Sequence, residues 1–143
     1  MYEDALRFLL ESRQKGDSSK EKAGLIGNCY FSLHRYEEAL PFFLESRQKG
    51  DSSKEKASKI GSCYFELSQF DEGIEYYETA IQATKKDNFN INWMQTIDNA
   101  LWYSFNLLSR TKESLQSPAY DQLLQRFQSL YSEFVEFWKE KEP

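Results

Sequence analysis

Apolar residues recur along this chain every three or four positions, which is the spacing of one face of an α-helix. One run between residues 52 and 67 has Ala57, Ile60, Gly61, Tyr64 and Leu67 on a single face, and the next has Ile74, Tyr77, Ala80 and Ile81. The pattern predicts helices that follow one another at short intervals and bury one face each.

Residues between these runs are typical of helix ends. Ser18 with Glu21, and Ser52 with Glu55, are spaced as capping boxes, which satisfy the first free amides of a helix. Gly16 and Gly50 each follow a helical run that ends in lysine, and they suit the left-handed residue just past a helix C-terminus. Each unit therefore reads as a pair of helices with defined ends.

The unit repeats with a period of 34 residues. Residues 2–35 and 36–69 share 25 of 34 residues, including an unbroken string of 13 at 11–23 and again at 45–57. Residues 70–87 keep the pattern of apolar and polar positions but not the amino-acid identities. Identity this high indicates a recent duplication or deliberate copying, and one sequence does not separate the two.

The residues at fixed positions of the unit carry a family resemblance. The first unit shows Ile26-Gly27 and Tyr30, then Ala39, Phe43 and Ser46, and the second shows Ile60-Gly61 and Tyr64, then Gly73, Tyr77 and Ala80. This series resembles the tetratricopeptide repeat. Ala23 and Ala57 stand where that family often has Trp, and Lys85 stands where Pro often closes the unit. The resemblance implies an all-α, right-handed superhelix of helix-turn-helix units.

The chain is accordingly divided into an array and a cap. We expect a half repeat at 1–17, repeats at 18–53 and 54–87, and a pair of longer helices at 88–143, separated by a turn at Ser117-Pro118. The last pair keeps helical periodicity without the repeat signature. A polar outer side on its last helix suits the end of an array, because a terminal unit must not expose its stacking face.

Composition narrows the class of protein. The 143 residues are 40% hydrophobic and include three Trp, nine Tyr and eleven Phe, so a buried core is expected. The net charge of −5 disfavours a nucleic-acid partner. The sequence has no apolar run long enough to span a membrane, and its N-terminus opens acidic, unlike a signal peptide. We expect a soluble cytoplasmic protein without a membrane partner.

The residues that usually carry chemistry do not form a constellation. The single histidine, His34, falls in a turn and is expected to be solvated. Cys29 and Cys63 lie beside core positions, which favours buried thiols over zinc ligands. No phosphate-binding loop or metal motif is present in the sequence. We therefore expect no enzyme activity, no cofactor and no metal site.

A binding surface remains as the expected functional feature. In the family that the chain resembles, the first helices of successive units line a concave groove for a peptide or a partner helix. Here that implied groove contains Asn28, Phe31, Arg35, Lys59, Ser62, Phe65, Glu66, Gln69 and Trp93. Phe31 and Phe65 either anchor an apolar side chain of the partner or only wedge adjacent helices apart. A basic clamp for chaperone C-termini is disfavoured, since Asn28 alone matches it well.

The sequence thus predicts a non-catalytic scaffold for protein–protein interaction. One alternative is an engineered or recently duplicated array with a structural or self-assembly role and no selected ligand. A second is an enzyme or nucleic-acid role for residues 88–143, with Trp93, Trp102 and Trp138 as stacking rings. The acidic balance and the helical periodicity favour core aromatics over that second alternative.

The first helical run predicts self-association. The apolar residues of this run wrap far round a helix, and only one neighbouring helix follows it to cover them. We expect a homodimer or a domain-swapped oligomer through residues 2–15, with contacts from Leu6, Phe8, Leu9 and Leu10.

Overall fold

The computed structural model describes residues 1–142, and 82% of the chain is helical. The described residues form seven helices and no strand. The helices are α1 (Tyr2–Gln14), α2 (Lys20–Ser32), α3 (Tyr36–Gln48), α4 (Lys54–Glu66), α5 (Phe70–Lys86), α6 (Ile91–Leu115) and α7 (Ala119–Lys141). Pro143, the last residue of the expected terminal pair at 88–143, lies outside the described residues.

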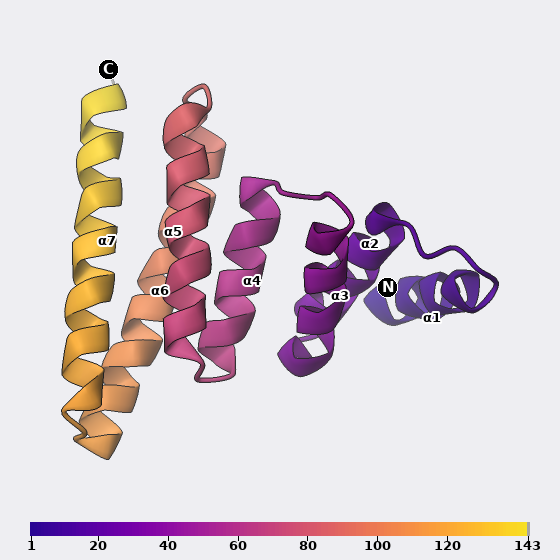
Figure 1. Cartoon of the computed structure of the whole chain (residues 1–143), viewed down its shortest axis with the longest axis horizontal. Helices are drawn as coiled ribbons and strands as arrows, with labels where there is room; N and C mark the ends of the chain where they lie inside the picture. The colour runs from indigo at the N-terminus through magenta and orange to yellow at the C-terminus, as the bar shows by residue number, and fades with distance from the viewer. Residues whose placement is uncertain (143) are drawn as a thin grey trace.

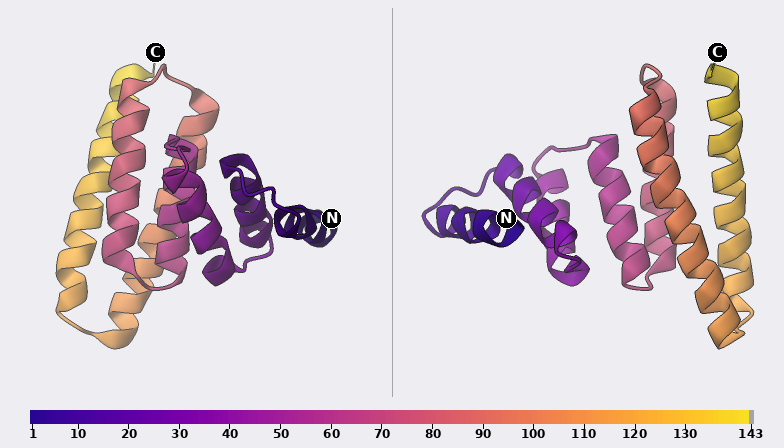
Figure 2. Two further views of the ribbon diagram at one scale, coloured as in Figure 1. Left: turned by 45° about the vertical axis from the view of Figure 1, so that its right-hand side comes forward. Right: turned by 180° about the vertical axis from the view of Figure 1, so that it is seen from behind.

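Helix pairs succeed one another along one direction. The helices run in chain order from α1 at one end to α6 and α7 at the other (Figure 1), and the turned views in Figure 2 show the same order. Helices α2 and α3 pack together, as do α4 and α5, while α6 packs on α4 and α7 on α5. The predicted all-α solenoid of helix pairs is confirmed.

The helix ends follow the predicted chemistry with a shift of one residue. The N-caps are Ser19 and Ser53, whose hydroxyls accept from the amides of Lys22 and Lys56. The predicted capping boxes at Ser18 and Ser52 are therefore wrong, because the adjacent serine takes the cap. Gly16 and Gly50 have φ of 105° and 115°, as a left-handed residue past a helix end requires.

Glycines allow the paired helices to approach closely. A Cβ atom on Gly61 would lie 3.2 Å from the carbonyl oxygen of Gly73, so the backbones of α4 and α5 nearly touch there. A Cβ atom on Gly27 would lie 2.6 Å from the ring of Phe43 on α3. The repeated glycine is thus a packing position, as its place in the unit predicts.

The two long C-terminal helices complete the largest core cluster. Phe127 and Phe134 of α7 are fully buried, together with Ile97 and Leu101 of α6. They pack with buried residues of α4 and α5. Within residues 1–142, no helix has both the length and the apolar character needed to cross a bilayer.

The N-terminal helix is better covered than its sequence predicts. Leu6 and Leu9 are buried against Ile26 and Cys29 of α2, and Leu10 is half-buried beside them. The prediction that Leu6 and Leu9 belong to an open self-association surface is therefore wrong. Phe8 points away from α2 and stays 66% exposed.

Candidate partner-binding surface

Four polar side chains connect the first helices of successive pairs. Asn28 lies on α2, Lys59 and Glu66 lie two turns apart on α4, and Tyr103 lies on α6. All four are at least partly accessible to solvent. We refer to these four residues as the cross-helix stripe.

Lys59 joins the first two helices of the stripe. Its ammonium donates a hydrogen bond to Oδ1 of Asn28 at 2.6 Å. Burial lowers the pKa of Lys59, and the nearby Lys56 ammonium adds to this. An ammonium group has three N–H donors, and Asn28 takes one. The others can bind a carboxylate or carbonyl oxygen of a partner.

Glu66 forms the other half of the stripe. The pKa of the nearby Tyr103 phenol is raised, chiefly by the carboxylate of Glu66. The equivalent position in the preceding repeat is Ser32, so this link occurs between α4 and α6 and is not repeated between α2 and α4. The stripe therefore has a positive end at Lys59 and a negative end at Glu66.

The two aromatic residues expected in the groove lie in different environments. Phe65 is 1% exposed and packs on Phe70, Tyr77 and Phe127 with ring centroids 5.2 to 5.5 Å apart. Its prediction as a partner contact is wrong, because α7 covers this side of α4. Phe31, its counterpart in the preceding repeat, is half-buried against the ring of Tyr36.

Two further predicted residues are used inside the fold. The hydroxyl of Ser62 is 2.7 Å from that of Tyr77, which in turn is 2.7 Å from the hydroxyl of Ser104. The indole nitrogen of Trp93 donates to Oγ1 of Thr84 at 2.8 Å, which ties α6 to α5. Ser62 and Trp93 remain half-buried, but their polar atoms already have partners within the chain.

Arg35 and Gln69 lie in the turns before α3 and α5. Both are exposed. The guanidinium of Arg35 stacks over the ring of Tyr30 at 4.9 Å and pairs with Glu38. It also lines a hollow beside α1, away from α4. The structure therefore brings Asn28, Lys59 and Glu66 together, while Arg35 and Gln69 stay outside the stripe.

Sequence reasoning missed two exposed residues, Tyr103 in the stripe and Leu25 beside it. Leu25 on α2 occupies the position that Lys59 has in the next repeat, and it is 47% exposed. Tyr103 is 48% exposed. Helix α6 lacks the repeat signature, so its groove side was not identified. A helical wheel that placed Ile97, Leu101 and Ser104 inward would have indicated Tyr103.

Comparison with known proteins identifies one repeat. Residues 58–87 match the family model described as a tetratricopeptide repeat. These residues cover most of α4 and all of α5. A search of curated proteins gave no match.

Proposed function

Because the chain carries a tetratricopeptide repeat and belongs with the proteins of that family, we propose that it is a non-catalytic scaffold that binds a partner protein on the cross-helix stripe. Tetratricopeptide repeats generally mediate protein–protein interaction and are generally non-catalytic. The ligand is an extended peptide or a helix of the partner. Repeats 18–53 and 54–87 contribute Asn28, Lys59 and Glu66, and the terminal pair at 88–143 contributes Tyr103.

The observation that carries this proposal is the 2.6 Å contact between Lys59 and Asn28. It positions a partly desolvated ammonium between two helices of successive repeats. A charge that is already partly removed from water loses less hydration when a partner's oxygen binds it. We therefore expect the partner to place a carboxylate or a backbone carbonyl at Lys59.

The other groups on and beside the stripe determine which further side chains the partner should present. The carboxylate of Glu66 lies near the phenol of Tyr103 and has acceptor capacity for an amide or a basic side chain. Leu25 and the ring of Tyr103 offer exposed apolar surface at either side. A segment in which an acidic residue and a donor are flanked by apolar residues fits this order of groups.

Affinity capture with two matched double variants tests the proposal. Lys59→Ala with Glu66→Ala alters the stripe without a change in net charge. Glu75→Ala with Lys86→Ala makes the same two types of substitution at exposed positions of α5. Proteins captured by the wild type should be depleted about tenfold by the stripe variant, which corresponds to about 1.4 kcal/mol. The α5 variant should retain them.

Unfolding midpoints of both variants show whether the fold is intact. If both variants capture the same proteins as the wild type, partner binding does not use the stripe and the proposal fails. If the α5 variant alone loses them, the binding surface is on the second helices of the pairs.

A further inference from the structure

The first helix has a surface that its near copy uses to bind a neighbouring helix. Helices α1 and α3 are identical at 10 of 13 positions. In α3, Ala39 is fully buried, Phe42 stacks on Tyr30 of α2 with centroids 5.8 Å apart, and Ser46 donates to the carbonyl of Lys20 at 2.8 Å. This side of α3 is therefore the face that packs against α2.

The same face of α1 is open. Its equivalent residues are Ala5, Phe8 and Ser12. Ala5 and Phe8 are exposed, and the hydroxyl of Ser12 reaches only the carboxylate of Asp17, at 3.4 Å. Among residues 1–142, no helix covers this face as α2 covers that of α3.

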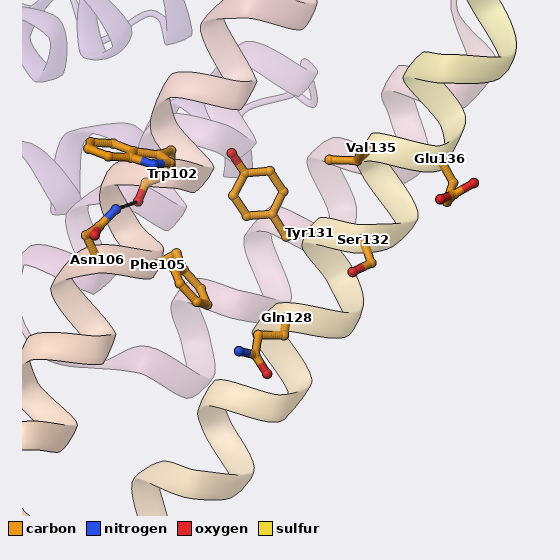
Figure 3. Close-up of a pocket in the computed structure, with 8 residues that line it drawn as sticks. All are labelled: Trp102, Phe105, Asn106, Gln128, Tyr131, Ser132, Val135 and Glu136. Carbon is orange, nitrogen blue, oxygen red and sulfur yellow. Dashed lines mark hydrogen bonds between the residues drawn. The ribbon is translucent and has the colours of Figure 1, made fainter.

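The opposite end of the array has an open groove with one apolar wall and a polar rim. Helices α6 and α7 line an open hollow of about 630 Å³ whose apolar wall is formed by Trp102, Phe105, Tyr131 and Val135. Figure 3 shows the ring of Tyr131 in the space between the two helices, with Trp102 on the α6 side and Val135 on the α7 side. Trp102 is 60% exposed.

A hydrogen bond between α6 and α7 fixes one ring of the groove. The hydroxyl of Tyr131 donates to Oδ1 of Asp98 at 2.8 Å, which fixes the ring between the helices. The helix and the groove are also at opposite ends of the molecule (Figures 1 and 2), so α1 does not reach the groove of its own chain. An α1 helix that fills the groove must belong to a second copy.

Helix α1 is long enough to span the groove, and the charges at the two ends are complementary. Helix α1 has 13 residues, or about 20 Å, and the groove side of α7 from Gln128 to Glu136 spans about 12 Å. The first turn of α1 is acidic, with Glu3 and Asp4, and exposed Lys15 follows its last turn. The groove has exposed Arg110 one turn beyond one end and Glu136 at the other. One orientation of α1 thus opposes unlike charges at both ends.

We propose that α1 of one copy docks in the groove between α6 and α7 of a second copy, with Phe8 between Trp102 and Tyr131. The contact joins two different surfaces, so it is head-to-tail, and every complex retains one free α1 and one free groove. Assemblies therefore grow in number of copies as the concentration rises. The proposal does not depend on the cross-helix stripe or on its partner.

Light scattering of two single variants tests this arrangement. Phe8→Glu disables α1 and leaves the groove intact, while Trp102→Glu disables the groove and leaves α1 intact. Both side chains are largely exposed, so neither substitution should lower the unfolding midpoint. The wild type should increase in mass over a hundredfold range of concentration. Each variant alone should stay monomeric, and an equimolar mixture should form a 1:1 dimer that grows no further.

Three results would overturn the proposal. The first is a monomeric wild type at all concentrations. The second is a Trp102→Glu variant that dimerises alone while Phe8→Glu does not, since this would mean that α1 binds α1. The third is a mixture that gives no dimer although both variants are folded.

Discussion

Phe65 and Phe31 occupy the same position of successive repeats, within the same local sequence Cys-Tyr-Phe, yet the structure predicts different effects when each is changed to alanine. Phe65 is 1% exposed and contacts rings from α5 and α7. Truncation of a fully buried Phe costs about 3–5 kcal/mol, through lost transfer energy and the cavity left behind. Phe31 is half-buried, and its truncation should cost about 1–2 kcal/mol.

A glycine beside Phe65 accounts for part of the difference in burial between Phe65 and Phe31. The ring of Phe65 lies so close to Gly73 that a Cβ atom there would clash with it, whereas the equivalent residue beside Phe31 is Ala39. Gly73→Ala should therefore destabilise the wild type and should lose most of that penalty in the Phe65→Ala background. This non-additivity would show that the two positions share one packing site.

Circular dichroism during thermal and guanidinium unfolding measures both effects. For a chain of this length, at about 3 °C per kcal/mol, the Phe65→Ala cost corresponds to a loss of about 9–15 °C in Tm, and the Phe31→Ala cost to about 3–6 °C. Equal and small losses for the two variants would refute the reasoning, because Phe65 would then not be enclosed by α7.

Three other predictions follow from particular contacts. Arg13 of α1 binds Glu45 of α3 at 2.7 and 2.5 Å, but in the next repeat Thr79 stands at the position of Glu45, and Arg47, at the position of Arg13, has a buried Nη1 without a hydrogen-bond partner in the described residues. Thr79→Glu should therefore stabilise the fold by about 0.5–1 kcal/mol in guanidinium unfolding, and it should give nothing in an Arg47→Met background. The hydrogen bond from Arg13 lowers the pKa of Glu45, so the Arg13–Glu45 pair stabilises the fold fully above the unfolded pKa of about 4.3, and this stabilisation is lost as the pH falls through the lower folded value. Arg13→Met should flatten this part of the plot of stability against pH, and an unchanged plot would contradict the prediction. Burial raises the pKa of Cys63 to about 12, so a thiol reagent at neutral pH should label this thiol only after guanidinium unfolds the chain. Rapid labelling of Cys63 in the native protein would show that α4 opens locally.

Much of the array could be predicted from the sequence because one unit is nearly copied. The 34-residue period and the glycines fixed the helix pairs, and the close approach at Gly61 followed from its place in the unit. Cap positions were harder, since Ser18 and Ser19 are adjacent and both can accept the same amides. Periodicity alone does not decide between two neighbouring serines.

The candidate surface was less predictable because it depends on the segment without the repeat signature. Phe65 is buried by Phe127, which is 62 positions later in the chain, and local sequence gives no sign of that contact. Tyr103 joins the surface for the same reason, through the way that α6 lies against α4. Lys59 and Asn28 were found because both belong to the repeats.

The most direct test of the scaffold function is hydrogen–deuterium exchange of the full chain, with and without the partner recovered by affinity capture. Bound partner should slow exchange in α2, α4 and α6 around Asn28, Lys59, Glu66 and Tyr103. The exposed sides of α3 and α5 should exchange as in the free protein. Slowed exchange confined to α3, α5 or α7 would contradict the account.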